Sequence, residues 1–583
     1  MKKSAKYIIA SLFVILSINI SNAQNTNTLY FMNEIAERNN LNPAFTPSCN
    51  FYFDFVFLPN TYFSFGNDNF ILRDFIYNQN GKTQSFLNSE ESLEHFFNNL
   101  QPTTTINLNY NLNILSFGFQ VKKSYFTFDL GVNMDAAVYM PSDLLKFALY
   151  GTPDPQNVNT FDFSQLGVDA SLYSSVAFGY MYRINKQLTV GAKAKFLMGY
   201  ANVNTNINKL NLNASRQEWS LETDGTINAS LPARFNTLEN GGIDFGSLQM
   251  NSTNELIELL YKPAGLGAAI DLGVKYEPIK NLVFSASVTD LGMIYWSRNS
   301  ISASMQGSHA INELIDYTVG DTLSTDAIVD QFTELGNEIL GTMRTDGENK
   351  PYKSMLRGNF FIGAEYGVLK NRISFGVVNR LKFKNTHLQD ELTVAVNFRP
   401  SHRFNASVSH SFINGRWGTI GLGLNAKMGI MNIYIIADYI PTSYAQIPLG
   451  DNAIAVEDKV ILANVLVPNR AQMFNVQMGW SWNIGQHAND LDRDGVKRRK
   501  DKCQETDIDF LRKQCPGLKK KELVDKQGCD RDDDKDGVIN CLDECPETPA
   551  GVTVNSAGCP IDPNEEINLE QDNISTPQDS IQQ

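Results

Sequence analysis

The feature that most constrains the fold is the alternation of apolar and polar residues in segments about ten residues long. The segment 474–484 shows this alternation most completely. Its apolar face holds Phe474, Val476, Met478, Trp480, Trp482 and Ile484, and its polar face holds Asn475, Gln477, Gly479, Ser481 and Asn483. Successive side chains of a strand point to opposite faces, so one face suits lipid and the other suits a lumen. The pattern predicts an all-β protein, an antiparallel transmembrane β-barrel. A soluble antiparallel sandwich is the alternative.

Fourteen segments carry this pattern, an even number as single-chain bacterial barrels require. They are 51–66, 105–121, 124–139, 166–184, 187–202, 265–277, 281–292, 357–367, 371–382, 390–399, 403–412, 416–427, 431–440 and 472–484. Tight turns such as 122–123 alternate with long connections such as 203–264 and 293–356. Short turns face the periplasm in such barrels, so we expect both ends of the barrel, 51–485, on that side and long loops outside.

The start of the chain has the features of an export signal. A basic beginning, MKKSAK, precedes an apolar run and the small-residue sequence Ser-Asn-Ala at 21–23, so residues 1–23 are predicted to be a signal peptide. A retained membrane helix is the alternative, but the apolar run is short. The segment 24–50 precedes the first strand, and we expect it to fill the lumen as a hatch.

Two twelve-residue loops near the C-terminus share the spacing Asp-x-Asp-x-Asp-Gly, each with an acid at position 12. The predicted ligands are Asp490, Asp492, Asp494, the main chain of Val496 and Asp501 in the first loop, and Asp532, Asp534, Asp536, the main chain of Val538, Asn540 and Asp543 in the second. Oxygen ligands at this spacing, with Gly for the sharp turn, suit Ca²⁺. The second loop is expected to bind more tightly, because Arg498 occupies position 9 of the first. A solvated acidic linker is the alternative.

Six of the seven cysteines lie in the same region and predict disulfide bonds. They are Cys503, Cys515, Cys529, Cys541, Cys545 and Cys559. Six cysteines allow fifteen pairings, and the sequence alone does not choose among them. Two equal spacings hint at Cys515–Cys529 and Cys545–Cys559, which leaves Cys503 for Cys541. Zinc is the rival interpretation, but the chain has no Cys-x-x-Cys pair. Disulfides indicate an oxidising compartment, and Cys49 is left as a free thiol.

The tail, residues 486–560, resembles thrombospondin type 3 repeats through DLDRDGVKRRKDKC at 490–503 and DDDKDGVINCLDECPETPAGVTVNSAGCP at 532–560. The resemblance implies repeats that bind calcium. In bacterial relatives such repeats often lead into a peptidoglycan-binding domain of the outer-membrane protein A type. Here only residues 561–583 follow, with six acids and no Lys or Arg, so they are expected to be disordered and peptidoglycan binding is not implied.

The N-terminal segment carries a second resemblance, through LYFM at 29–32 and the motif Asn42-Pro43-Ala44. With its fourteen predicted strands, the chain resembles the fatty-acid-transporter-like barrels, and more closely an uncharacterised family of such barrels in Bacteroidota. The resemblance covers about residues 24–484. It implies an N-terminal hatch and a barrel that passes or binds a hydrophobic small molecule.

One predicted strand breaks its own pattern. In 281–292 every second residue is apolar and is expected to face lipid, and the same alternation places Asp290 on that face. A carboxylate at the mid-depth of the bilayer costs free energy. Gly292 suggests a bulge or kink that turns Asp290 inward. In the resembling barrels a kinked strand opens a lateral route to the membrane. The alternative places Asp290 at the aqueous rim.

Function is less constrained than fold. No Gly-x-Ser-x-Gly, His-Glu-x-x-His or P-loop motif occurs, so an enzyme is not expected. The net charge of −14 gives no footprint for nucleic acid. We therefore expect an outer-membrane protein with its tail in the periplasm and outer-membrane lipid around the barrel. Three roles stay open: binding or passing a hydrophobic small molecule, an accessory role in an assembly of outer-membrane or periplasmic proteins, and surface adhesion. A continuous apolar cavity below the hatch favours the first role, and a packed lumen favours the second.

Overall fold

The computed structural model describes most of the chain from residue 27 to residue 561. The described ranges are 27–67, 69–79, 82–86, 89–98, 100–150, 158–214, 219–237, 243–250, 252, 258–311, 335–339, 341–348, 350–384, 387–401, 403–413, 416–441, 444–448, 454–456, 459–462, 464–468, 473–486, 496, 500, 502–503, 506, 508–549 and 551–561. The predicted signal peptide lies outside them. The chain divides into two compact units, Met1–Gly485 and Gln486–Gln583, and each is described by itself.

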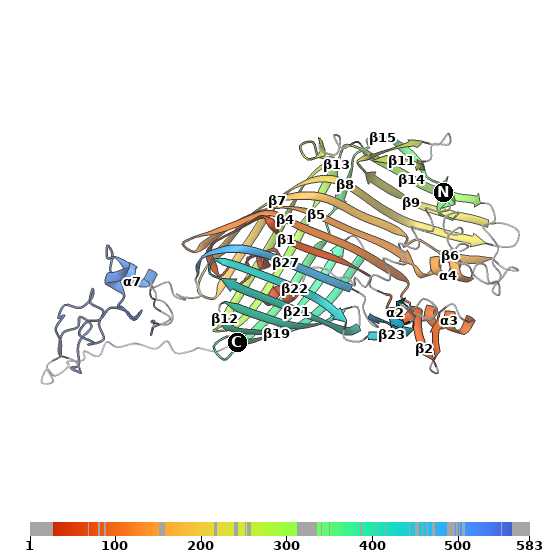
Figure 1. Cartoon of the computed structure of the whole chain (residues 1–583). Helices are drawn as coiled ribbons and strands as arrows, with labels where there is room; N and C mark the ends of the chain where they lie inside the picture. Colours follow the sequence, from red (N-terminus) through yellow and green to blue (C-terminus); the bar gives the residue numbers. More distant parts are fainter. Residues whose placement is uncertain are drawn as a thin grey trace, which may run out of the picture. The chain divides into compact units, whose positions relative to one another are not determined.

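The first unit is a closed barrel of fourteen antiparallel strands (Figure 1). In order around the wall they are β1 (Cys49–Asn67), β4 (Thr103–Val121), β5 (Ser124–Pro141), β7 (Gly167–Arg183), β8 (Leu188–Ala214), β12 (Gly265–Ile279), β13 (Leu282–Trp296), β17 (Gly358–Val368), β18 (Ile373–Lys384), β19 (His387–Ser401), β20 (Phe404–Ile413), β21 (Arg416–Met428), β22 (Met431–Pro441) and β27 (Met473–Gln486). Pairing of β1 with β27 closes the ring. Every strand expected from the alternation is present, so the predicted strand number and fold class are confirmed.

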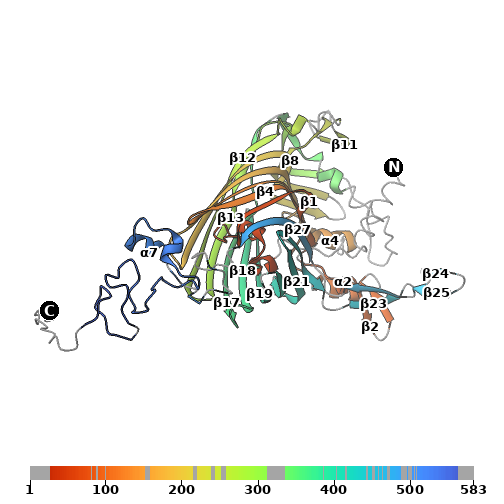
Figure 2. The same cartoon turned by 60° about the vertical axis from the view of Figure 1, so that its left-hand side comes forward.

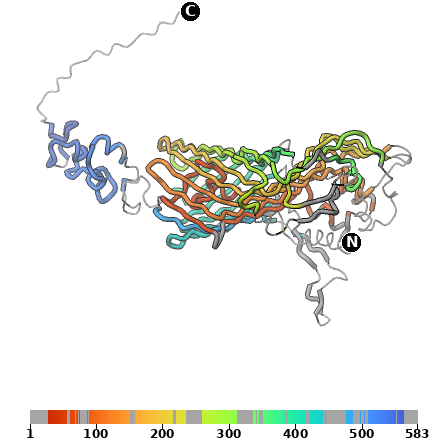
Figure 3. Tube along the Cα trace, turned by 90° about the horizontal axis from the view of Figure 1, so that it is seen from above, coloured from red at the N-terminus to blue at the C-terminus, as the bar shows by residue number. Residues whose placement is uncertain are grey.

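The two faces of the wall differ as the alternation predicts. In β27, Met478 and Trp482 point outward and are exposed, whereas Asn475 and Ser481 point inward and are buried. The other strands repeat this arrangement, and Figure 3 shows the strands side by side along the barrel. The outer surface is therefore apolar and suits lipid, while the lumen is polar.

The hatch lies in the lumen. Two short 3₁₀ helices, η1 (Asn27–Phe31) and η2 (Ala36–Asn40), run ahead of β1. Leu29, Tyr30, Phe31, Met32, Ile35, Leu41 and Phe45 of the hatch form one apolar cluster with Phe361, Val378, Ala395, Tyr434 and Ile436 of the wall. Its described residues are thus packed against the wall as part of the barrel interior.

One strand extends well beyond its predicted end. The sequence predicts a strand at 187–202, but β8 continues to Ala214 and carries an added sheet of β6 (Asn159–Asp162), β9 (Trp219–Ser230), β14 (Ser300–Ile311) and β15 (Arg344–Glu348) (Figure 1). A register shift between Ile207 and Lys209 interrupts the two-residue period. This interruption, in an Asn-rich segment, hides the strand from an alternation argument.

The remaining elements of the first unit lie mostly at the end of the barrel with the long connections (Figures 1 and 2). They are α2 (Leu72–Phe75), α3 (Glu90–Asn98), α4 (Ser142–Tyr150), β16 (Tyr352–Met355), and the hairpins β2–β3 (Ile76–Gln79, Lys82–Ser85), β10–β11 (Ala233–Thr237, Ile243–Met250), β23–β26 (Tyr444–Pro448, Asn464–Pro468) and β24–β25 (Ile454–Val456, Lys459–Leu462). Helix α4 packs on β6 through Phe147 and Phe161.

The second unit contains α7 (Ile508–Gln514) and α8 (Lys520–Leu523). In the described part of the chain no helix has the length and apolar character to cross a membrane.

Wall glycines make room for the hatch. A β-carbon added at Gly376 would lie 2.3 Å from the ring of Phe31, and one at Gly363 would lie 2.7 Å from the ring of Tyr30. We therefore expect Gly376→Val to lower the free energy of unfolding by about 1–3 kcal/mol through overpacking. The measurement is denaturant unfolding of the full-length protein in micelles.

The matched control is Gly341→Ala, because a β-carbon at Gly341 meets no atom within 4 Å. This control should change the free energy of unfolding by no more than about 0.5 kcal/mol. Equal stability of the two variants would show that the hatch does not pack against the wall at Gly376.

Candidate functional site

The Asn-Pro-Ala motif fastens the hatch to three wall strands. Asn42 Nδ2 donates to the carbonyls of Val274 (3.3 Å) and Ala286 (3.2 Å), in β12 and β13. Asn42 Oδ1 accepts from the Ala44 amide at 2.9 Å, which fixes the turn. A β-carbon at Gly191 of β8 would lie 2.1 Å from the Pro43 carbonyl oxygen. The motif therefore turns the hatch and also docks it on the wall.

Charged wall residues hold the rest of the hatch. Arg399 Nη2 donates to the Phe31 carbonyl at 2.7 Å. Lys193 Nζ donates to Asn39 Oδ1 (2.6 Å), to Asn40 Oδ1 (2.5 Å) and to Asp129 Oδ2 (2.8 Å). Lys193 is almost fully buried, so these hydrogen bonds take the place of those that its ammonium group would form with water. The hatch is thus bonded to the wall from several sides.

A polar cavity of about 180 Å³ remains between the hatch and the wall. Its lining includes Glu37, Tyr62, Asn109, Asn111, Asn113, Asp129, Asn133, Asp135, Tyr173, Lys193, Lys195, Asp290, Leu356, Arg357, Asn359, Arg380 and Lys382. Most of these side chains are polar or charged. The space is therefore suited to a charged or hydrogen-bonding group, and differs from the continuous apolar cavity that a purely hydrophobic ligand needs.

One lining residue offers a free donor. The Arg380 side chain is buried, and its Nε and Nη2 donate to Asn359 Oδ1 at 3.0 and 2.5 Å. Its Nη1 is buried and, in the described part of the chain, has no hydrogen-bond partner. A buried guanidinium N–H without a partner is costly, and an anionic group in the cavity would satisfy it.

The wall is irregular where the cavity reaches it. Asp290 adopts φ +60°, and the pairing of β12 with β13 shifts register opposite Asp271. Strand β13 pairs with β17 up to Thr289 and with β16 only from Met293. The predicted bulge is therefore present, and it lies within the strand and not at its end. Gly292 is required here, because a β-carbon would lie 2.3 Å from the Ala268 carbonyl oxygen.

The bulge turns Asp290 inward, into a charge network with half-buried Lys195 and buried Asp271. Lys195 Nζ lies 2.6 Å from Asp290 Oδ1 and 2.8 Å from Asp271 Oδ2. The Asp290 amide donates to Asp271 Oδ1 at 2.7 Å. Asp271 is fully buried, so Lys195 neutralises a carboxylate that has no access to water. The sequence pattern identified Asp290 but not its partners, Lys195 and Asp271. These two residues are charged and lie at alternate, inward-facing positions of otherwise apolar strands, which is the pattern that could have identified them.

The second loop of the tail gathers its carboxylates. Oxygen atoms of Asp532, Asp534 and Asp536 lie within 4.8 Å of one another. Oδ1 of Asp534 and Oδ2 of Asp536 are buried and have no hydrogen-bond partner in the described residues. A β-carbon at Gly558 would lie 2.1 Å from Asp543 Oδ1 and 3.0 Å from Asp536 Oδ2, so Asp543 lies beside the group. Converging oxygens without donors fit a hard cation.

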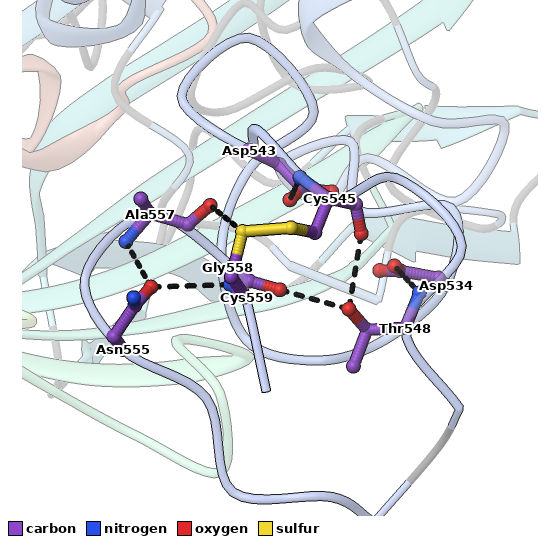
Figure 4. The surroundings of a disulfide bond; sticks show 8 residues. All are labelled: Asp534, Asp543, Cys545, Thr548, Asn555, Ala557, Gly558 and Cys559. Atoms are coloured by element: carbon purple, nitrogen blue, oxygen red, sulfur yellow. Dashed lines mark hydrogen bonds between the residues drawn. A yellow bond between two sulfur atoms is a disulfide. The ribbon is translucent and has the colours of Figure 1, made fainter. Parts of the chain in front are cut away.

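The disulfide Cys545–Cys559 holds this loop in shape (Figure 4). The Thr548 amide donates to Asp534 Oδ2, and the Cys545 amide donates to Asp543 Oδ1, each at 2.8 Å. Thr548 Oγ1 bonds to the Gly558 carbonyl at 2.8 Å, across the ring that the disulfide closes. The covalent ring thus orients two of the predicted ligands.

Asn540 and Val538 are placed differently from the converging carboxylates. Asn540 Oδ1 accepts from the Asp533 amide at 2.8 Å, so its oxygen is already engaged. Asp533 itself faces Arg531, whose hydrogen bonds lower the pKa of the Asp533 carboxyl. The main chain of Val538 follows the turn at Gly537, which adopts φ +100°. In the first loop, Asp490, Asp492, Asp494 and Asp501 lie outside the described residues, and Val496 packs against the small core of the tail.

Two of the suggested disulfide pairs are wrong. The structure joins Cys503 to Cys529 and Cys515 to Cys541, with Cα atoms 4.9 and 6.0 Å apart. Cys545 pairs with Cys559, the partners that the spacing favours. The repeat that does indicate the pairing is Cys-x-Glu-Thr, at 503–506 and 545–548. Each copy begins one of two equivalent rings, which the disulfides Cys503–Cys529 and Cys545–Cys559 close. In each ring the threonine hydroxyl bonds to a glycine carbonyl just before the second cysteine. The spacing argument missed this repeat because α7 and α8 lengthen the first ring.

A closed 14-stranded barrel with an apolar outer face and a polar, plugged lumen is an outer-membrane β-barrel. The chain belongs to a family of unknown function, DUF5723, whose sequence profile matches residues 43–438. No curated protein matches the sequence.

Several solved structures resemble the barrel at low identity. The Pseudomonas putida toluene transporter TodX is 8% identical, with 80% of this chain and 96% of that chain covered and a TM-score of 0.33. The Ralstonia pickettii toluene transporter TbuX is 7% identical, with 77% and 94% covered and a TM-score of 0.35. A FadL homologue from Pseudomonas aeruginosa is 8% identical, with 79% and 99% covered and a TM-score of 0.33.

The charge network at the bulge can be tested by removing its cation. We expect Lys195→Met to lower the free energy of unfolding by about 3–5 kcal/mol, because the buried Asp271 carboxylate is left without a cation. Adding Asp271→Asn to that variant should restore much of the loss. Lys275→Met is the control, because Lys275 and Glu277 form a more exposed pair, and it should cost about 1 kcal/mol or less. Equal losses in Lys195→Met and the control would contradict the network.

Proposed function

We propose that the protein is a plugged outer-membrane barrel that binds an amphiphilic small molecule with an anionic head group and passes it between the lumen and the membrane. The single observation that carries this proposal is Arg380, which lines the polar cavity and whose buried Nη1 has no hydrogen-bond partner among the described residues. A carboxylate, phosphate or sulfate group would supply the missing acceptor. A non-enzymatic role is part of the proposal.

The irregular wall supports the amphiphilic character of the ligand. On the outer face, Leu291, Met293 and Met355 are exposed around the point where β13 changes partner from β17 to β16. On the inner face, Asp290 and Arg357 line the cavity. An apolar chain could lie against the first group while an anionic head reaches Arg380 inside the cavity. A hydrocarbon without a head group would offer Arg380 Nη1 no acceptor.

The test compares two ligands with the same chain, oleate and methyl oleate, which lacks the negative charge. We expect Arg380→Met in the full-length protein in nanodiscs to weaken oleate binding at least about tenfold, the effect of losing a charged hydrogen bond. Binding of methyl oleate should be weak and unchanged.

The control is Lys275→Met, since Lys275 is a barrel cation that does not line the cavity. This variant should bind oleate as the wild type does. Equal affinity of the wild type for oleate and its methyl ester would overturn the proposal, as would unchanged oleate binding by Arg380→Met.

We further propose that the tail is a calcium-stabilised periplasmic arm. Asp534 Oδ1 and Asp536 Oδ2 support the calcium site, because these buried oxygens have no hydrogen-bond partner among the described residues and their carboxylates converge with that of Asp532. Asp532, Asp534, Asp536, Asp543 and the Val538 main chain would hold the ion. Cation binding would stabilise the tail by about RT ln(1 + [L]/Kd).

Calorimetric titration of the full-length protein with Ca²⁺ tests the arm. We expect Asp534→Ala to remove the tightest binding step, because it deletes a converging carboxylate, whereas Asp492→Ala leaves that step in place. A wild-type protein without binding heat, or an Asp534→Ala variant with the tight step intact, would refute the calcium site in the second loop.

A further inference from the structure

Asparagine recurs on the inner face of β4. Residues 107, 109, 111 and 113 are all asparagine and occupy alternate positions of the strand. Asparagine is a poor strand former, because its side chain competes for main-chain hydrogen bonds. Four of them on one face therefore weaken the strand unless they serve the lumen. Asn109, Asn111 and Asn113 do line the polar cavity.

One of these asparagines belongs to a row of four side chains that crosses the wall. Tyr62 of β1 pairs with Asn111. Asn111 pairs in turn with Asn133 of β5, which pairs with Tyr173 of β7. All four line the cavity, and paired residues of neighbouring strands have β-carbons about 4.5–5.5 Å apart. Two amides are therefore flanked by two aromatic rings along one continuous inner surface, which we call the Tyr-Asn row.

The two amides of the row are held in place and keep capacity for further bonds. Asn111 Nδ2 donates to Asn133 Oδ1 at 2.5 Å, and Asn133 Nδ2 donates to Ser175 Oγ at 3.0 Å. Each amide has two donor hydrogens and an oxygen with two lone pairs, so these bonds use only part of its capacity. Asn111 and Asn133 are half-buried, which leaves the rest accessible from the cavity.

A neighbouring amide independently points to a ligand. Asn109 lines the same cavity, is only 8% exposed, and its Nδ2 has no hydrogen-bond partner among the described residues. A buried donor without an acceptor is destabilising. Asn109 lies two residues from Asn111 on the same face, about 7 Å along the strand. A polar group bound on the row would therefore also be in reach of Asn109.

A sugar ring matches the chemistry of the row. Its hydroxyl groups both donate and accept hydrogen bonds, as the amides do. Its C–H faces are apolar and pack on aromatic rings such as those of Tyr62 and Tyr173. A hydrocarbon would leave the amides unsatisfied, and a bare carboxylate accepts hydrogen bonds without donating any. A sugar is thus the ligand group that uses the rings and both functions of the amides.

The row shares its cavity with the anion site. Arg380 lines the same cavity, and Tyr62 lies within electrostatic reach of it. The cavity volume of about 180 Å³ is below the roughly 300–1,000 Å³ of pockets that enclose whole drug-sized ligands. The cavity therefore suits one small head group, and an attached chain has to lie elsewhere.

We propose that the head group is an acidic sugar, so that the ligand is an anionic glycolipid. The sugar ring would lie on the Tyr-Asn row, with hydroxyl groups bonded to Asn109, Asn111 and Asn133. Its negative group would reach Arg380. This inference rests on the proposed function and names the ligand class of the same cavity.

Three ligands with a twelve-carbon chain separate the sugar from the charge. Dodecyl β-D-glucuronide carries both, dodecyl β-D-glucoside carries only the sugar, and dodecanoate carries only the charge. Binding to the full-length protein in nanodiscs is measured by calorimetry, with empty nanodiscs as the reference. We expect the wild type to bind the glucuronide at least about tenfold more tightly than either other ligand, because each of those lacks a charged bond or several neutral ones.

The variant Asn111→Leu/Asn133→Leu removes both amides at similar side-chain volume. It should lower glucuronide affinity to that of dodecanoate and leave dodecanoate binding unchanged. Arg380→Met should weaken dodecanoate binding and leave dodecyl glucoside binding unchanged. The control is Asn379→Leu, since Asn379 is a wall asparagine that does not line the cavity, and it should change no affinity. If the double variant does not fold, Tyr173→Leu takes its place, with the same expected loss of preference.

The outcomes separate this inference from the proposed function. Equal affinity of the wild type for the glucuronide and dodecanoate, with both weakened by Arg380→Met, would overturn the sugar and retain the anion site. A preference for the glucuronide that survives in the row variant would overturn the assignment to the Tyr-Asn row. Binding of dodecyl glucoside without any effect of Arg380→Met on dodecanoate would retain the sugar site and refute the anion site. A protein that binds none of the three ligands would refute both.

Discussion

A ring of fourteen strands encloses more space than its own inward side chains fill, and the structure depends on how that space is occupied. The hatch supplies the missing volume. Its apolar side chains cluster with Phe361 and Tyr434, and its polar groups bond to Arg399 and Lys193. Glycines such as Gly191 and Gly376 let main chain and rings approach the wall closely. The wall and hatch therefore form one packed interior, which explains why the remaining cavity is small and polar.

Polar groups in such an interior have to be matched in detail, because no bulk water is present to solvate them. Most charges in the lumen meet this condition in pairs, such as Lys193 with Asp129 and Lys195 with Asp290. The exceptions are informative for the same reason. Arg380 Nη1, Glu37 Oε2 and Asp54 Oδ1 are buried and lack hydrogen-bond partners among the described residues.

The fourteen strands could be predicted because lipid and lumen impose opposite demands on alternate residues, and that demand is visible in each strand alone. The continuation of β8 to Ala214 could not be predicted, since a register shift near Asn208 breaks the period there. Asn42 and Asp290 were identified from local signals, a motif and a misplaced charge. Their partners Ala286 and Lys195 belong to other strands, and only closure of the ring brings them together. Two of the three suggested cysteine pairs are wrong for a related reason, because spacing along the chain does not show that α7 and α8 are inserted in the first ring.

The position of the hatch directly before β1 has a consequence for its binding strength. Hatch and barrel are joined through Cys49, the first residue of β1, so docking is an intramolecular event. A short tether of this kind gives the hatch an effective concentration in the lumen of millimolar or more. Contacts that would be too weak to hold a separate peptide therefore suffice to keep it docked. For the same reason a locally released hatch stays near its seat and returns to it without a search through solution.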